Sequence, residues 1–165
     1  MNTDLTSPLD VTMTKPPGAR KLRTGRISEI GRGYVITTVT KDRRSLFTDF
    51  RLARLAIREL RACDTFGVCA TMAFVLMPDH LHWMLQLADG TLPALLRRYK
   101  SCSGDAINRV RNTPGSAVWQ ADSHDHAIRD GADLQQIARY IVANPLRAGL
   151  VGSVREYPHW DAAWL

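Results

Sequence analysis

The segment FGVCATMAFVLMPDHLHWMLQL, residues 66–87, decides most of the expected architecture. Its first half, 66–77, is a continuous apolar run with β-branched and aromatic side chains, which is typical of a buried strand. Pro78 and Asp79 interrupt the run, and residues 80–87 then alternate as a half-buried strand does. We therefore expect the two halves to pair as an antiparallel hairpin.

Two histidines share one side of the second strand. Successive side chains of a strand point to opposite faces, so His80 and His82 lie together while Leu81 and Trp83 point into the core. Neutral imidazole is the commonest metal ligand among side chains, and two on one face can share an ion. A pair of half-exposed histidines with ordinary hydrogen bonds gives the same pattern. The spacing alone leaves both interpretations open.

The flanking segments complete an α+β order. In addition to the hairpin we expect a strand at 33–40, a helix at 46–63, an amphipathic helix at 90–112, a strand within 117–129 and a helix at 133–144. This order predicts a ferredoxin-like (RRM-like) split βαβ plan, in which an antiparallel sheet carries two helices on one face. The helix at 133–144 is an addition at the C-terminal end.

Residues 1–26 differ in character from the remainder. They show no apolar period and carry Arg20, Lys21 and Arg23. We expect either a flexible basic arm that orders on an anionic ligand or a solvated tail. Residues 27–165 are expected to form a single domain, because a chain of 165 residues accommodates one core rather than two.

Charge and composition favour nucleic acid as the partner. The net charge of +6 points to a polyanion, and no stretch approaches the ~20 apolar residues of a membrane span. No nucleotide-binding loop is present, so we expect no nucleotide cofactor. The N-terminal sequence lacks the layout of a signal peptide, and the three cysteines without CxxC spacing are expected to be small buried side chains in a reducing cytoplasm.

The predicted helix at 133–144 carries polar residues beside its apolar stripe. Tyr140 and Asn144 are four residues apart and therefore stack on one face, with Gln136 one turn earlier. Tyrosine and asparagine in this position suit the edge of a cleft. Each also has a structural interpretation, since Tyr140 can pack at an interface and Asn144 can end the helix before Pro145.

The helix predicted at 90–112 has a basic face. Its cations include Arg97, Arg98, Lys100 and Arg109, and we expect them to contact the DNA backbone. Trp119 and Tyr99 are candidates for stacking on bases, although Tyr99 falls on the apolar stripe and is expected in the core. A basic helix face that is only solvated explains the pattern equally well.

Several of these segments together resemble one family. MPDHLHWML (77–85) resembles the histidine–hydrophobe–histidine (HUH) motif of single-tyrosine transposases. The segments VWQADSHDHAIRD (118–130), ARYIVANPLRAGLV (138–151) and EYPHW (156–160) resemble the C-terminal part of their REP-associated branch. The similarity runs from about residue 31 to 161 and departs from the pattern at 121–124.

The resemblance implies a role for each matching residue. His80 and His82 are the paired ligands of Mg²⁺ or Mn²⁺, and Tyr140 is the nucleophile. Asn144 supplies a third metal contact or helps to place the tyrosine. His126 matches a recurrent histidine without an assigned role, and we count it with Gln136 as support for the site.

The implied activity is transposition of single-stranded DNA. The resemblance predicts an endonuclease that cleaves and rejoins hairpin-flanked DNA, at REP-type repeats, through a 5′-phosphotyrosine intermediate with a free 3′-hydroxyl. We expect a monomer rather than a swapped dimer. Such chemistry retains the energy of the broken bond in the phosphotyrosine, so no ATP is required.

Two other functions stay open on the residues alone. A zinc-dependent hydrolase could use His80, His82, His124 and His126, because two HxH pairs on neighbouring strands can form a tetrahedral site. A non-catalytic nucleic-acid-binding module is the second alternative, because the same ferredoxin-like plan serves as the RRM scaffold. The aromatic-rich RNP1 run of that scaffold is missing from this sequence.

Overall fold

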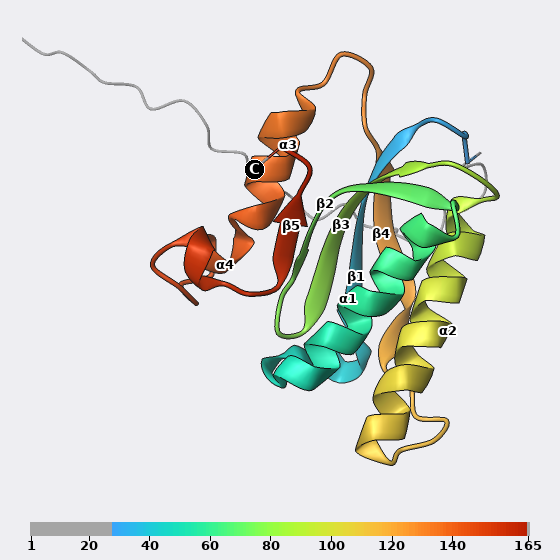
Figure 1. Cartoon of the computed structure of the whole chain (residues 1–165), viewed down its shortest axis with the longest axis vertical. Helices are drawn as coiled ribbons and strands as arrows, with labels where there is room; N and C mark the ends of the chain where they lie inside the picture. Colours follow the sequence, from blue (N-terminus) through green and yellow to red (C-terminus); the bar gives the residue numbers. More distant parts are fainter. Residues whose placement is uncertain (1–27, 165) are drawn as a thin grey trace, which may run out of the picture.

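Five antiparallel strands form one sheet in the order β4-β1-β3-β2-β5 (Figure 1). The structure, a computed structural model, describes residues 28–164, so the predicted arm with Arg20, Lys21 and Arg23 lies outside the described residues. The strands are β1 (Gly33–Thr40), β2 (Cys69–Leu76), β3 (His80–Leu87), β4 (Trp119–Ala127) and β5 (Trp160–Ala162).

Two long helices connect strands of the sheet, and two shorter ones follow β4. They are α1 (Phe50–Thr65), α2 (Leu92–Arg111), α3 (Leu134–Val142) and the one-turn α4 (Asn144–Arg147), with short 3₁₀ turns at Lys41–Arg43, Leu46–Thr48 and Val154–Glu156. Thr91 caps α2 as its sequence predicts, because its hydroxyl accepts a hydrogen bond from the N–H of Ala94. Asp133 caps α3 in the same way.

The strand order confirms the α+β class with an antiparallel sheet. β3 lies between β1 and β2, and β1 lies between β3 and β4, so each helical crossover passes over one intervening strand. The predicted hairpin is confirmed, with Leu76 opposite Leu81 next to the turn. β5 was not predicted, because a strand of three residues carries no measurable period.

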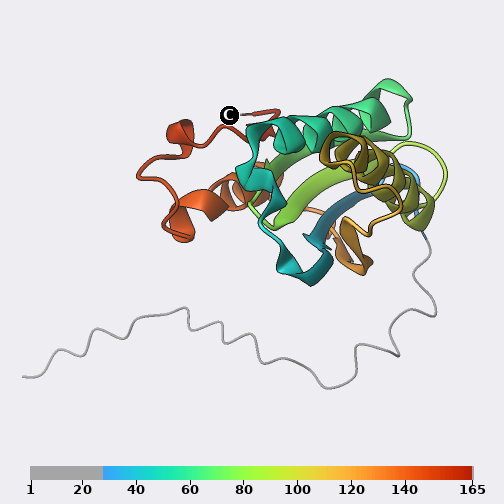
Figure 2. The ribbon, with the colours of Figure 1, turned by 90° about the horizontal axis from the view of Figure 1, so that it is seen from below.

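α1 and α2 lie side by side over one face of the sheet (Figure 2). The predicted core residues of β3 on this face, among them Leu81 and Trp83, are buried beneath the two helices. Tyr99 belongs to the same core, as expected. The prediction that Trp119 stacks on bases is wrong, because its side chain is buried there and donates a 2.9 Å hydrogen bond to the Ser103 hydroxyl.

The opposite face, which the sequence led us to expect open, is largely covered. α3 packs its Ala138 and Ile141 against Val35, Val75 and Met84 of the sheet, and β5 extends this second core. An amphipathic helix needs an apolar partner, and the face of the sheet opposite α1 and α2 supplies it. The imidazoles of β3 therefore lie beside a packed helix.

Individual apolar side chains differ in their burial. Phe50, the first residue of α1, is 59% exposed, and its ring packs against His159. Cys63 and Cys69 are buried as predicted, and burial raises the pKa of Cys63 to about 11. Cys102 is exposed on α2, contrary to expectation. Within residues 28–164, no helix has the length and apolar character to cross a membrane.

Candidate active site at the start of β3

The rings of His80 and His82 converge on one point beside the sheet. Their Nε2 atoms are 3.1 Å apart, and the two rings meet edge to face with centroids 4.8 Å apart. Both side chains are partly buried. The common face deduced from the strand period is thus confirmed, and the two nitrogens that face each other are equivalent atoms of the two rings.

A second residue contacts the Nδ1 atom of each ring, on the side away from the other histidine. The Nδ1 atom of His80 is 2.5 Å from Oδ1 of Asp79, whose other oxygen accepts a hydrogen bond from Arg43 at 3.2 Å. The Nδ1 atom of His82 is 2.9 Å from the hydroxyl of Thr37 on β1. Sequence reasoning missed both partners. The carboxylate next to the HxH pair could have indicated Asp79, whereas Thr37 follows only from the register of β1 and β3.

The electrostatics keep the pair suited to metal binding. Burial, with the positive charges of His80 and Arg147, lowers the pKa of His82 to about 4, so this imidazole is neutral near pH 7. Burial alone would raise the pKa of Asp79, but the hydrogen bond from His80 and the Arg43 guanidinium outweigh it and lower that pKa. Asp79 is therefore an ionised acceptor for the ring of His80.

This donor set fits a divalent cation. When Nδ1 of each ring donates its proton to Asp79 or Thr37, both Nε2 atoms present lone pairs to each other across 3.1 Å. Such an arrangement is unfavourable unless a proton or a cation lies between the nitrogens. Histidine ligands are characteristically held by a carboxylate or another acceptor on the far ring nitrogen. His80 and His82 are thus the residues that could hold the ion.

The segment with Tyr140 and Asn144 is interrupted between the two residues. α3 ends at Val142 and α4 begins at Asn144, so the prediction of one helix over 133–144 is wrong at its end. Pro145 has no N–H to donate to the carbonyl of Ile141, and the side-chain amide of Asn144 donates to that oxygen instead, at 2.7 Å. Asn144 therefore begins α4 rather than ending α3, and its side chain joins the two helices.

Tyr140 is exposed and in contact with Arg147. The Tyr140 side chain is 66% exposed, and the guanidinium carbon of Arg147 lies 3.9 Å from its ring centroid. The positive charge of Arg147 contributes to the low pKa of His82. Sequence reasoning missed Arg147. Gln136 is exposed in the first turn of α3, where its N–H donates to Asp133.

His124 and His126 are not brought to the pair. Thr37 lies opposite both His82 and His124 in the sheet register, so β1 separates the two histidines by about 10 Å, twice the usual strand spacing. Both side chains on β4 are exposed. In the part of the chain that the structure describes, no three His, Cys, Asp or Glu side chains are gathered as a metal site. The tetrahedral four-histidine site of the hydrolase interpretation is therefore not assembled.

The basic residues of α2 lie on the other face of the sheet. Arg97 and Arg109 are exposed there, and Arg98 stacks on Phe66 with 4.4 Å between its guanidinium carbon and the ring centroid. The ammonium of Lys100 donates to the carbonyls of residues 120–122, at 2.8, 3.2 and 3.0 Å. Lys100 thus ties α2 to the irregular start of β4, and DNA contact by these residues stays a prediction.

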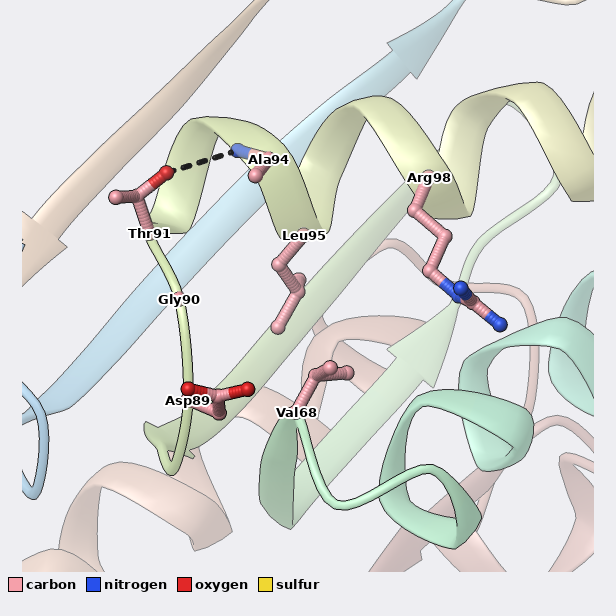
Figure 3. A pocket seen from close by; sticks show the side chains of 7 residues that line it. All are labelled: Val68, Asp89, Gly90, Thr91, Ala94, Leu95 and Arg98. Atoms are coloured by element: carbon pink, nitrogen blue, oxygen red, sulfur yellow. Dashed lines mark hydrogen bonds between the residues drawn. The ribbon is translucent and has the colours of Figure 1, made fainter.

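A hollow below the start of α2 is remote from the histidines. Figure 3 shows the side chains that line it, among them Val68, Asp89, Leu95 and Arg98, around about 270 Å³. Asp89 lies two residues after the end of β3, whereas His80 is the first residue of that strand. The hollow is therefore at the opposite end of that strand and is separate from the candidate site.

Comparison with known proteins identifies the family. The family model described as "Transposase IS200 like" matches residues 32–144, a span that includes β1, the histidine pair, Tyr140 and Asn144. The chain belongs to the IS200-like transposase family. An Escherichia coli K12 protein named REP-associated tyrosine transposase is 29% identical to this transposase over 141 residues, which cover 81% of this chain and 80% of that protein.

Two further comparisons agree with this assignment. A Haemophilus influenzae protein assigned to the REP-associated tyrosine transposases is 30% identical over 143 residues, covering 76% of our transposase and 77% of the relative. A solved structure of a REP-associated tyrosine transposase bound to a REP hairpin has the same fold, with a TM-score of 0.64 and 24% identity. The structural match covers 82% of this chain and 79% of the solved chain.

Proposed function

We propose that this transposase is a metal-dependent endonuclease for single-stranded DNA, which cleaves and rejoins hairpin-flanked DNA through a 5′-phosphotyrosine. His80 and His82 would hold Mg²⁺ or Mn²⁺, and Tyr140 would be the nucleophile. REP-type repeats are the proposed target, since the relatives are named for them and one solved relative holds a REP hairpin. Asn144 is the proposed third metal contact or the residue that helps to place Tyr140.

The observation that carries the proposal is the convergence of the two Nε2 atoms, 3.1 Å apart, on the face of the sheet that α3 covers. Two imidazoles whose far nitrogens are held by Asp79 and Thr37 are ordered before any ligand arrives. Preorganised ligands lose little freedom on binding an ion. The exposed hydroxyl-bearing ring of Tyr140 is accessible to a DNA strand that lies across this junction.

The chemistry balances without an external energy source. A cation on these histidines withdraws charge from a phosphate oxygen and orients the group. The Tyr140 oxygen bonds to phosphorus, the bond from phosphorus to the 3′ oxygen breaks, and the leaving 3′ oxygen takes a proton. The tyrosine proton passes to solvent. The 3′-hydroxyl of the same or another strand reverses these changes and joins DNA.

Cleavage of a labelled hairpin tests the proposal. We expect EDTA to abolish cleavage of a REP-type hairpin with single-stranded flanks and Mg²⁺ or Mn²⁺ to restore it. His80→Ala and His82→Ala should each lower cleavage at least a hundredfold while the circular-dichroism spectrum stays native. His124→Ala is the matched control, because it removes an exposed imidazole across β1 and should cleave at the parental rate.

The outcomes separate the proposal from the hydrolase interpretation. Cleavage that survives in the His80→Ala/His82→Ala double variant would contradict the proposed metal site. Tightly held zinc in the purified protein, together with loss of activity in His124→Ala, would favour the four-histidine hydrolase.

A further inference from the structure

Arg147 links the two polar residues that the family resemblance singles out. Its Nη1 atom donates to the backbone carbonyl of Tyr140 at 2.7 Å, and its Nη2 atom donates to the side-chain oxygen of Asn144 at 2.8 Å. Its guanidinium also lies over the Tyr140 ring, 3.9 Å from the centroid, well within the ~6 Å range of cation–π contacts. One side chain thus touches the ring, the backbone and the neighbouring amide.

These contacts restrict an otherwise weakly packed ring. Tyr140 is 66% exposed on α3, so burial does little to select one orientation of its hydroxyl. The helix break at Ala143 also separates Asn144 from the regular hydrogen bonding of α3. Arg147 spans this break, because its own helix α4 begins at Asn144 and its guanidinium reaches back to Tyr140.

The guanidinium retains capacity for an anion. An arginine has five N–H donors, and the bonds to Tyr140 and Asn144 use two of them. Arg147 is exposed, so the remaining donors are accessible to a ligand. Tyr140 belongs to α3, and α3 packs on the sheet face that also carries His80 and His82. A phosphate attacked by Tyr140 near those histidines would lie against this guanidinium, whose planar fork suits phosphate oxygens.

We propose that Arg147 positions Tyr140 and Asn144 as one unit and binds the phosphate that Tyr140 attacks. This inference rests on the proposed function and adds a residue to it. Lysine in its place would keep the positive charge that attracts the phosphate but lose the fork that bonds Tyr140 and Asn144 together, and glutamine would lose the charge. The two substitutions therefore separate positioning from phosphate binding.

A chemically neutral phosphate tests the contact directly. A hairpin is selected from a pool with randomised single-stranded flanks by covalent capture with the parent protein, which also maps the cleaved phosphate. The same hairpin is then made with a methylphosphonate at that phosphate. Binding is measured in the Tyr140→Phe background, so that no cleavage occurs. We expect Arg147→Gln to weaken binding of the natural hairpin by about tenfold and to have little effect on the methylphosphonate hairpin.

Controls and kinetics define what would overturn the inference. Arg139→Gln removes an exposed cation of the neighbouring helix α3 and should weaken the binding of both hairpins equally. In the protein that retains Tyr140, and can therefore cleave, Arg147→Lys should keep the parental KM and lower kcat at least tenfold. Equal losses on both hairpins for Arg147→Gln would refute the phosphate contact, and a parental kcat for Arg147→Lys would refute the positioning role. If the parent protein captures no hairpin, the proposed function fails and the inference fails with it.

Discussion

The carboxylate of Asp79 is the side chain through which we expect the proposed metal binding to change without a change of fold. It sits in the turn before β3, accepts from Arg43 and faces Nδ1 of His80 at 2.5 Å. A histidine ligand whose far nitrogen is held by a carboxylate has a fixed ring orientation and a more basic free nitrogen. Asp79 therefore orders His80 through its Nδ1 atom and leaves Nε2, the proposed metal-binding atom, facing His82.

Replacing Asp79 by asparagine should weaken metal binding. The amide keeps the shape of the side chain but loses the negative charge, and changes of this kind cost roughly 10- to 100-fold in metal affinity. Titration with Mn²⁺, followed by electron paramagnetic resonance, measures the effect. Asp89→Asn, a carboxylate after the other end of β3, is the control and should bind Mn²⁺ as the parent does. Equal affinities for Asp79→Asn and the parent would show that the carboxylate does not support the site.

At the scale of elements, the segment EYPHW (156–160) acts as a strap on the end of β2. The hydroxyl of Tyr157 donates to the carbonyl of Leu76 at 2.7 Å, and the N–H of Leu76 donates to the carbonyl of His159 at 2.8 Å. β5 follows directly and pairs with β2. Leu76 is four residues from His80, so this strap holds the strand that leads into the site.

The free energy of unfolding should fall on acidification because this strap contains His159. Burial, and then the positive charge of Arg54, lower the pKa of His159 below its ordinary value of about 6.5. The unfolded chain therefore takes up a proton near that pH while the folded chain resists it, and the free energy of unfolding is highest above about pH 6.5 and falls below it. Urea unfolding of the parent and of His159→Gln, at pH 7.5 and 5.5, measures the contribution.

The difference between the two proteins isolates His159. His82 also has a lowered pKa and contributes with the same sign, but it does so in both proteins. The parent should therefore lose more stability between the two pH values than His159→Gln does. Identical losses would show that His159 is not a source of the pH dependence.

How well an element could be predicted depended on how much of its pattern is local. The alternation in residues 80–87 placed His80 and His82 on one face and Leu81 in the core, and the structure agrees. The break after Val142 was missed because Pro145 was taken to end one helix, whereas it lies in the first turn of a second, one-turn helix, α4. β5 has three residues and depends on the edge of β2 for its hydrogen bonds, so no local sequence pattern predicts it.

The partners of the candidate site were harder to predict than its motif residues. His80, His82, Tyr140 and Asn144 were identified through spacing and family resemblance. Thr37 is 45 residues from His82 in sequence and meets it only through the register of two strands. Arg147 reaches Tyr140 across a helix break, which removes the regular i, i+4 geometry on which sequence reasoning depends.

At the scale of the whole molecule, one face of the sheet forms the larger core with α1 and α2, and the other face carries the proposed active site. α1 and α2 cover one face, with the basic residues of α2 beyond them, while the histidine pair and α3 occupy the other. DNA that reaches the histidines would therefore leave most of the α2 cations on the far side. Residues 1–26, with their cluster of Arg20, Lys21 and Arg23, then become the stronger candidates for added contact with phosphate.

Removing the N-terminal charges should make DNA binding less sensitive to salt. Each phosphate contact on single-stranded DNA contributes about −0.7 to the slope of log affinity against log salt. If Arg20, Lys21 and Arg23 each contact a phosphate, replacing all three by serine should reduce that slope by roughly 2. Hairpin binding between 50 and 300 mM NaCl measures it, with Arg58→Ser on α1 as a single-charge control. An unchanged slope would show that the N-terminal cations do not contact DNA.

The most direct test of the account is the covalent adduct on Tyr140. Phenylalanine at this position removes one oxygen and retains the ring beneath Arg147, so folding and hairpin binding should be close to those of the parent. End-labelled DNA on denaturing gels, with peptide mass mapping, should show a 5′-phosphotyrosine at Tyr140 in the parent and no adduct in Tyr140→Phe. An adduct that persists in Tyr140→Phe, or maps to another residue, would contradict the tyrosine mechanism.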